Sequence, residues 1–447
     1  MTHQKTKLFH NRSSSKEFLL YKTDAKPQKY TAKALSSIET NRILKALPEI
    51  LVGKTFVENA LARFETSEKF ESMVIKIDTL NHEGSETAGN DKIDIWLDVA
   101  NVIDSICRRE NGMWGRLDQG MLGCFFSPTN QTSSLEFAKK IKKILSESTD
   151  ETISIGIASY PTLTFTRDQI IDNAAKALDH AAFFGPDSIV SFDAVSLNIS
   201  GDTLYQNGNI DGAIAEFKTA ISLDTSDVNI RNSLGVCYGI LGDSKKALKE
   251  FQEVLRLDPN EIMAMYNIGL LNMLNNKLPD ALKYFLDADR KKEEDIFEVA
   301  FQIGRVYLDM GKSELAKEFL EKAVKLNPES RSALNSLGEC YTALNMTDEA
   351  ISVYKKAIRK NPNDAEALSA LGCLFDLLGE NPEITTIFCQ QSIDIAPENG
   401  LYRYRLGSLY LKRNQLEDAL IQFQKAQDLG YDARKMIKKI TKLIKDT

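Results

Sequence analysis

The 447-residue sequence is poor in the residues that build metal and redox sites: it has six cysteines, four histidines and two tryptophans. The cysteines lie far apart and no two form a CxxC pair, which argues against a zinc site and a disulfide framework. The histidines are scattered, without metal-ligand spacing. No apolar run approaches the roughly 18 residues of a membrane span. We therefore expect a protein of a reducing cytoplasm, with no metal, no cofactor and no membrane insertion.

Positive charge is in excess near the start of the chain. Acidic residues outnumber basic ones by 63 to 56, yet residues 1–50 carry ten basic and four acidic side chains. A chain that is acidic overall is a poor nucleic-acid binder unless its basic residues cluster, so we expect no nucleic-acid partner. We interpret residues 1–35 as a flexible, solvated basic leader. A docking or membrane-surface role for this leader is the alternative.

A repeat of 34 or 35 residues dominates the C-terminal half of the sequence. It is marked by the glycines Gly201, Gly235, Gly269, Gly304, Gly338, Gly372 and Gly407. Alanine follows 12 residues later in every unit except the sixth, which has Ile384 there, or Thr385 if one residue is inserted. A large apolar residue comes 16 residues after the glycine, at Phe217, Phe251, Phe285, Leu320, Tyr354, Phe388 and Phe423.

This spacing predicts two antiparallel helices per unit. Glycine and alanine at fixed positions let two helices approach to about 8–10 Å, and the large side chain fills the gap between them. The pattern closely resembles the tetratricopeptide repeat (TPR), with seven units over residues 194–428. Residues 429–447 hold Ile437, Ile440 and Ile444 at helical spacing between lysines. We interpret this last segment as a helix that caps the end of the solenoid.

The TPR resemblance implies a concave face, lined by the first helix of each unit, that binds a protein or peptide and performs no catalysis. The positions expected on this face are apolar in the third unit but mostly polar in the fifth, as at Asn335 and Glu339. Contiguous exposed apolar surface usually marks a partner site. The predicted partner-binding residues are Met263, Tyr266, Leu270, Met273, Phe301 and Arg305. One alternative is that packing of the superhelix buries them; another is that the leader docks onto them.

Residues 36–193 show a different pattern, in which strand-like and helix-like segments alternate and predict a sheet covered by helices. Two segments resemble GGDEF-type diguanylate cyclases. The sequence Ser-Ile-Gly-Ile-Ala at 154–158 matches a strand of that family, and residues 174–182, followed by Gly185, match one of its helices. Residues 116–122 then take the place of the family's Arg-Tyr-Gly-Gly-Asp-Glu-Phe. The resemblance implies an α/β nucleotide-cyclase-like fold.

The residues that cyclase chemistry needs are missing from this segment. The resemblance implies carboxylates for two divalent cations, a glycine pair beside the nucleotide, and basic side chains for phosphates. Asp118 and Gln119 stand at the glycine pair, and Lys76 at the first-strand aspartate, although Asp78 follows two residues later. The product-binding motif keeps only Arg109. The acidic pair and the phosphate positions hold Gly120, Met121, Ala182 and Pro186.

Together these features predict a bacterial-type cytoplasmic signalling or scaffold protein. In this interpretation a catalytically inactive GGDEF-like domain precedes an all-α TPR solenoid that binds partners. The alternative is a nucleotide-responsive protein whose first domain still binds GTP or cyclic di-GMP, or keeps weak cyclase activity.

Overall fold

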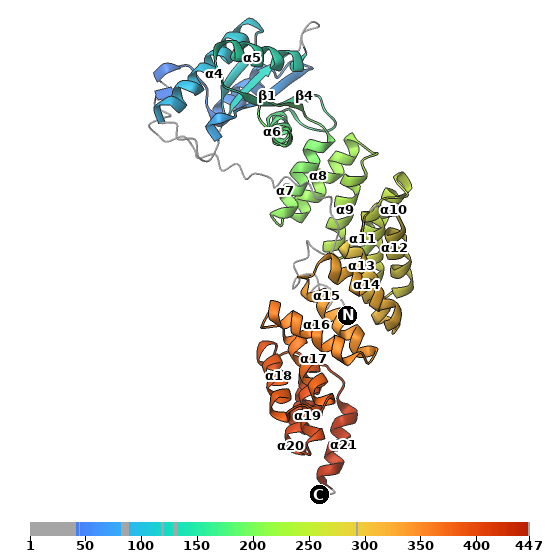
Figure 1. The fold of residues 1–447 in the computed structure, drawn as a ribbon. Coiled ribbons are helices and arrows are strands. Elements are labelled where there is room, and N and C mark those ends of the chain that lie inside the picture. The colour runs from blue at the N-terminus through green and yellow to red at the C-terminus, as the bar shows by residue number, and fades with distance from the viewer. Residues whose placement is uncertain are drawn as a thin grey trace. The chain divides into compact units, whose positions relative to one another are not determined.

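The computed structural model describes residues 42–43, 45–81, 89–117, 120–127, 133–291 and 294–445 (Figure 1). The chain forms two compact units, Met1–Pro259 and Asn260–Thr447. The basic leader predicted at 1–35, and its docking onto the repeats, lie outside the described residues.

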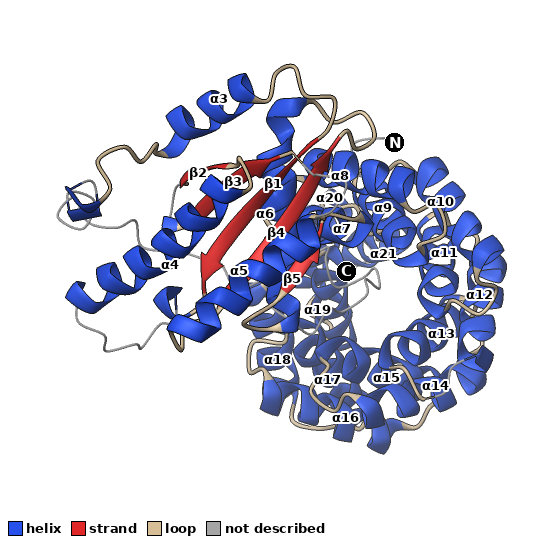
Figure 2. Ribbon diagram, turned by 90° about the horizontal axis from the view of Figure 1, so that it is seen from above, coloured by secondary structure: helices blue, strands red, loops and turns tan. Residues whose placement is uncertain are grey.

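A five-stranded mixed sheet lies in the first unit (Figure 2). Its strand order is β2-β3-β1-β4-β5, and neighbouring strands are antiparallel except for β4 and β5, which are parallel. The order β1-α4-β2-β3-α5-β4 along the chain is a split βαβ arrangement. The bounds are α3 (Gly53–Arg63), β1 (Phe70–Ile77), α4 (Gly89–Arg109), β2 (Met113–Arg116), β3 (Leu122–Phe126), α5 (Ser134–Ser148), β4 (Ile153–Tyr160), α6 (Ile170–Ala181) and β5 (Ile189–Ser191).

Both faces of the sheet are buried. Successive residues of a strand point to opposite faces, so a single strand contributes side chains to two cores. Met73 and Ile75 of β1 join a core with α4 and α5 that surrounds the buried Trp96. Phe70 and Val74 of the same strand join a second core with α3 and α6. Helices α4 and α5 therefore cover one face, and α3 and α6 the other. The predicted sheet covered by helices is confirmed.

Gly156 brings α6 very close to β4. A Cβ atom at this position would lie 2.1 Å from the carbonyl oxygen of Ala174 and 2.3 Å from the backbone nitrogen of Leu178. Only glycine lets the two backbones approach this closely. The two segments that carry the cyclase resemblance, 154–158 and 174–182, thus pack directly on each other.

From Ala194 onward the described chain consists of paired helices, as the sequence predicts, and each odd-numbered helix packs on the helix that follows it. In the first unit they are α7 (Ala194–Gln206), α8 (Ile210–Leu223), α9 (Val228–Ile240) and α10 (Ser244–Leu257). In the second unit they are α11 (Ile262–Leu274), α12 (Leu278–Lys291), α13 (Phe297–Asp309), α14 (Ser313–Leu326), α15 (Arg331–Ala343), α16 (Thr347–Lys360), α17 (Ala365–Leu377), α18 (Pro382–Ile395), α19 (Gly400–Lys412) and α20 (Leu416–Asp428), followed by α21 (Arg434–Lys445).

Each pair is held together where a glycine of the first helix meets a large side chain of the second. A Cβ atom on Gly269 of α11 would lie 2.7 Å from the ring of Phe285 on α12. Ala281, 12 residues after that glycine, is fully buried. The same close contact pairs Gly201 with Phe217, Gly235 with Phe251, Gly304 with Leu320 and Gly338 with Tyr354.

The sixth pair departs from the expected spacing. A Cβ atom on Gly372 would lie 2.5 Å from Sγ of Cys389, so this glycine faces Cys389 and not Phe388. Thr385 is fully buried in the place of the alanine, whereas Ile384 is 47 % exposed. One additional residue in the turn before α18 therefore shifts the register by one position. The expectation that Phe388 fills this gap is wrong, and the inserted-residue alternative is correct.

The turn within each pair uses a residue with positive φ, seven positions after the marker glycine. Glycine and asparagine are the residues that adopt this left-handed conformation most readily, and it ends one helix so that the chain can reverse. These residues are Gly208, Gly242, Asn276, Gly311, Asn345, Gly379 and Asn414, with φ between 56° and 80°.

Helix α6 lies between the sheet and the first repeat helices. His180 Nδ1 is 3.3 Å from both Asp193 Oδ1 and Ser196 Oγ, at the start of α7. Lys176 Nζ pairs with Glu216 Oε1 of α8 at 2.6 Å. Burial alone would raise the pKa of Asp193, but hydrogen bonds from His180 and Ser196 lower it below its usual value. The α/β part of this unit is therefore docked on the first repeat.

Helix α21 covers the last helix pair. Ile440 is fully buried against Phe423 and Ala426 of α20, and Ile437 and Ile444 pack at the edge of this core. Helix α21, within the segment 429–447 predicted as a cap, therefore packs on α20 through its isoleucines.

Candidate functional site

The six predicted partner-binding residues lie on the first helices of the third and fourth pairs, α11 and α13. On α11, Tyr266 and Leu270 are each 1 % exposed. The ring centroid of Tyr266 lies 5.5 Å from that of Phe285, inside the helix pair. Met263 and Met273, near the two ends of the same helix, are half-buried. Tyr266 and Leu270 thus present almost no surface, whereas the two methionines present part of theirs.

On α13, Phe301 and Arg305 lie one helical turn apart and are both half-buried. The guanidinium carbon of Arg305 lies 5.8 Å from the centroid of the Phe301 ring, within cation–π range. Phe301 also stacks on Phe297, with ring centroids 5.8 Å apart and planes 5° apart. We call Met263, Met273, Phe301 and Arg305 the accessible strip. Binding of a partner by these residues stays a prediction.

Polar side chains of the fifth and sixth pairs form a hydrogen-bonded cluster. Nδ2 of Asn335, on α15, lies 3.2 Å from both carboxylate oxygens of Asp364 and 3.2 Å from Oε2 of Glu366. Burial raises the pKa of Glu366, and the negative charges of Asp364 and Glu339 raise it further. Oδ1 of Asn335 is buried and has no hydrogen-bond partner in the described structure. The cluster therefore keeps one unmet acceptor.

The first pair has a comparable set of polar groups on α7. Asn198, Asp202 and Tyr205 follow one another at spacings of four and three, so they share one face of the helix. Oδ1 of Asn198 and the hydroxyl of Tyr205 are buried without a partner among the described residues. Burial raises the pKa of Asp202 to about 7 and is the main cause that raises the pKa of Tyr205 to about 12. These residues occupy the positions, relative to Gly201, that were expected on the concave face.

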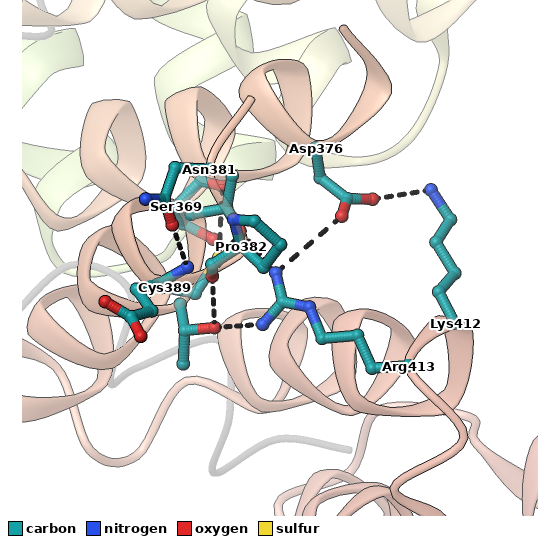
Figure 3. Close-up of polar contacts among 10 residues, drawn as sticks. Ser369, Asp376, Asn381, Pro382, Cys389, Lys412 and Arg413 are labelled. Carbon is teal, nitrogen blue, oxygen red and sulfur yellow. Dashed lines mark hydrogen bonds and ion pairs between the residues drawn. The ribbon is translucent and has the colours of Figure 1, made fainter. Parts of the chain in front are cut away.

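Three charged groups of the last two pairs, by contrast, pair with one another (Figure 3). Asp376 on α17 accepts from Lys412 Nζ at 2.6 Å and lies 3.9 Å from Nη2 of Arg413. Arg413 also donates to the hydroxyls of Thr385 and Thr386 on α18. This network joins α17, α18 and the end of α19, so we assign it a structural role.

The α/β part holds a lysine where the cyclase resemblance expects a carboxylate. Lys76 of β1 interacts with Asp179 of α6 and with Asp78. Burial lowers the pKa of Lys76, and burial raises the pKa of Asp179 to about 6 although the charge of Lys76 opposes this.

Asp78 follows β1 directly, and its carboxylate accepts hydrogen bonds from three groups. It accepts from the Ser154 hydroxyl at 2.8 Å, the Thr152 hydroxyl at 2.9 Å and the backbone N–H of Asp187 at 2.9 Å. These bonds tie the ends of β1, β4 and the loop before β5 together. They account for an aspartate at this place without a metal.

The other positions compared with the cyclase motif have ordinary surroundings. The carbonyl oxygen of Gly120 accepts from Trp96 Nε1 at 2.9 Å, and Met121 packs at the edge of the core under α3. Arg109, Ala182 and Pro186 are exposed. Asp118 and Gln119 lie outside the described residues. Within the described ranges, no three His, Cys, Asp or Glu side chains come together as a metal site. No described helix has the length and apolarity needed to cross a bilayer.

Family models match the repeat region. A tetratricopeptide repeat model matches residues 240–296 and 301–375, and a TPR repeat model matches residues 201–242. The chain contains tetratricopeptide repeats. The matches lie outside residues 36–193. No curated protein is significantly similar to the chain.

Solved structures of TPR proteins match parts of this chain with TM-scores below 0.5. YrrB, described as a TPR protein with an unusual peptide-binding site, is 23 % identical, with a TM-score of 0.38 over 42 % of this chain and 95 % of YrrB. A TPR protein from Parabacteroides merdae is 18 % identical, with a TM-score of 0.43 over 56 % of this chain and 98 % of that one. PilF of Pseudomonas aeruginosa is 19 % identical, with a TM-score of 0.42 over 47 % and 95 %.

Two features of the TPR units were missed by sequence reasoning. The polar face of α7 was not singled out, although Asn198, Asp202 and Tyr205 stand at the same distances from Gly201 as other inner-face residues do from their own glycines. The Gly or Asn at each turn was also available as a signal, because it recurs seven residues after each marker glycine.

Proposed function

We propose that the TPR units bind extended segments of partner proteins along their inner helices, so that the chain acts as a non-catalytic scaffold. The observation that carries this proposal is a set of buried polar atoms without partners in the described structure. Within the described repeat helices, four such atoms lie on first helices of pairs and one, Glu216 Oε2, lies on a second helix; the four are Asn198 Oδ1, Tyr205 Oη, Gln302 Oε1 and Asn335 Oδ1. A buried polar atom without a hydrogen bond costs about 1–3 kcal/mol.

Within either compact unit, an extended peptide bound to the inner helices would meet such groups. Its backbone N–H groups are donors for the amide oxygen of Asn198 in the first unit and for that of Asn335 in the second, and main-chain hydrogen bonds of this kind give affinity without demanding one sequence. The accessible strip adds apolar contact, because methionine side chains adapt to ligands of different shape. Arg305 supplies a cation beside that apolar surface.

Selection of random 12-residue displayed peptides on the full chain tests this proposal. Affinities of the selected peptides are measured by fluorescence anisotropy for the wild type, for Met273→Glu with Arg305→Glu, and for the control Lys283→Glu. Lys283 is exposed on α12, the second helix of the pair. We expect the inner-helix variant to weaken binding by about tenfold or more, which is about 1.4 kcal/mol. Equal affinities in all three proteins, with unchanged circular dichroism, would overturn the proposal.

We further propose that residues 36–193 are a degenerate GGDEF-like domain without cyclase activity. The observations that support this are the close packing of the two resembling segments at Gly156, the lysine at position 76, and the hydrogen bonds that occupy Asp78. A lysine at this place repels the cations that the reaction needs.

Incubation of the full chain with GTP and Mg²⁺ or Mn²⁺, followed by chromatography, is expected to yield no dinucleotide above a buffer control. Product that disappears in an Asp78→Asn variant would contradict the proposal. Calorimetry with GTP and with cyclic di-GMP tests the alternative that this domain still binds a nucleotide. A Kd tighter than about 100 μM for either ligand would favour that alternative.

A further inference from the structure

Helix α21 carries six cationic residues and no acidic one. At about 100° per residue, the six side chains fall within an arc of about 140° on one side of the helix. All of them are exposed: Arg434, Lys435, Lys438, Lys439, Lys442 and Lys445. We call these six residues the basic face.

The apolar side of α21 fixes the direction in which the basic face points. Ile440 lies on the opposite side of the helix and is fully buried with Phe423 and Ala426 of α20. Ile437 and Ile444 pack at the edge of the same core. The basic face therefore points away from α20, and its cations are held together on one surface.

Ion pairs neutralise little of the basic face. Arg434 pairs with Asp432 at 2.8 Å. The five lysines form no ion pair with a carboxylate anywhere in the described part of the chain. Helix α16 is different, because it carries both signs of charge and its Lys360 pairs with Glu329 at 2.6 Å. The lysines of α21 thus keep their full charge toward solvent.

The crowding of these like charges costs stability. Lys435 and Lys439 are four positions apart, as are Lys438 and Lys442, and like charges at this spacing destabilise a helix. A helix that only covered the apolar end of the repeats could mix acidic and basic residues on its outer side, as α16 does. The uncompensated cations therefore point to an anionic surface that neutralises them on contact.

We propose that the basic face of α21 binds the anionic phospholipids of a membrane surface, on which the protein adsorbs without inserting a helix. Clusters of about four to eight Lys or Arg residues on an amphipathic helix are typical of contact with anionic headgroups. Five of the six cations here are lysines, which act as point charges and demand no fixed geometry from their partner. A layer of many equivalent phosphates is such a partner.

Two side chains beside the basic face favour lipid over a nucleic acid. Leu443, 39 % exposed, borders the face next to Lys439, and Tyr431, 36 % exposed, precedes the helix. Leucine and tyrosine side chains both occur at the boundary between headgroups and acyl chains. The basic face itself has no aromatic side chain on which bases could stack, and no Asn or Gln to read a base edge. The proposal does not depend on what the inner helices bind.

Co-sedimentation of the full chain with sucrose-loaded vesicles tests the proposal. One set of vesicles is phosphatidylcholine with about 30 mol % phosphatidylserine, and the other is phosphatidylcholine alone. At about 0.15 M NaCl we expect binding to the anionic vesicles only, and about 0.5 M NaCl should release the protein because salt screens exposed charges. Equal binding to both kinds of vesicle, or no binding to the anionic ones, would overturn the proposal.

Paired substitutions assign the binding to α21. Lys438→Gln with Lys442→Gln removes two charges from the middle of the basic face. Lys245→Gln with Lys249→Gln removes two exposed lysines at the same spacing from α10 and is the matched control. Glutamine and lysine are about equally good helix formers, so circular dichroism should not change in either variant.

The two variants should differ in vesicle binding. Each lysine near an anionic surface adds about fivefold to the affinity, so the α21 variant should bind about tenfold more weakly or worse, and the control should bind like the wild type. Equal affinities of the two variants would assign the adsorption to another basic segment, such as residues 1–35, and would overturn the proposal.

Soluble polyanions distinguish a membrane from other anionic partners. Binding of labelled single-stranded DNA of about 20 nucleotides, and of labelled polyglutamate, is measured by fluorescence anisotropy at the same salt concentration. We expect both to bind more weakly than the vesicles when affinities are expressed per anionic group. If either binds as tightly as the phosphatidylserine vesicles, the basic face is a site for that polyanion and the lipid assignment is wrong.

Discussion

Replacing Asp202 with asparagine should stabilise the first TPR unit above pH 7 and change it little near pH 4. Burial on α7 raises the pKa of Asp202 from the usual 3.8 to about 7. Between these two values the folded protein keeps a proton that the unfolded chain has already released. The stability of the wild type therefore falls as the pH rises through this window, and the loss is complete above pH 7. Asparagine does not ionise, so the variant escapes this loss.

The size of the effect follows from the shift in pKa. About three pKa units at about 1.4 kcal/mol per unit give an upper limit of about 4 kcal/mol. Asp202 keeps part of its surface in water, so we expect on the order of 2 kcal/mol. A change of this size in the free energy of unfolding is larger than the error of a denaturation experiment. Comparing the variant with the wild type also cancels most of the contribution that other titrating groups make to the pH dependence of stability.

Urea unfolding at pH 4.5 and pH 8.5, followed by circular dichroism, measures the effect in the wild type and in Asp202→Asn. Asp211→Asn, a change at an exposed carboxylate of α8, is the matched control. The stability gained by Asp202→Asn should be larger at pH 8.5 by on the order of 2 kcal/mol, and Asp211→Asn should show no such increase. If both variants shift by the same amount at the two pH values, Asp202 is not a buried, unpaired carboxyl group.

Two further predictions test the packing. Ala350→Leu places a large side chain at a fully buried position of α16 and should cost about 1–3 kcal/mol, seen as a lower thermal midpoint; an unchanged midpoint would count against the helix-pair register. Gly156→Ala puts a Cβ atom 2.1 Å from the Ala174 carbonyl oxygen and should cost more than about 3 kcal/mol, measured by urea unfolding, whereas Gly208→Ala, with open space around the new atom, should cost about 1–2 kcal/mol. Equal losses for the two glycine variants would contradict the close approach of α6 and β4.

The helix pairs were predictable because their packing depends on residue size at fixed spacing. The close packing of α11 on α12 requires small residues at Gly269 and Ala281 and a large one at Phe285. The size of each residue can be read directly from the sequence. The sixth unit shows the limit of counting residues. One inserted residue moves Cys389 into the position expected for Phe388; the sequence leaves both registers open, and the contact of Cys389 with Gly372 decides between them.

Which apolar residues of α11 would be exposed was not predictable. Tyr266 and Met273 are both apolar residues expected on the inner face, and periodicity treats them alike. In the structure the Tyr266 ring packs on Phe285, whereas Met273 keeps part of its surface. The burial of each position depends on how the neighbouring helices pack against it, which the periodicity of α11 alone does not contain. For the same reason the burial of Asp202, which sets its pKa, could not be read from the sequence of α7.

Hydrogen–deuterium exchange of the full chain, with and without a saturating selected peptide, tests the central claim most directly. If the inner helices bind extended segments, the peptide should slow exchange in first helices such as α11, α13 and α15, and leave α12, α14 and α16 nearly unchanged. Protection confined to the second helices, or to residues 53–191, would show that the binding surface lies elsewhere and would contradict the proposed role of the accessible strip.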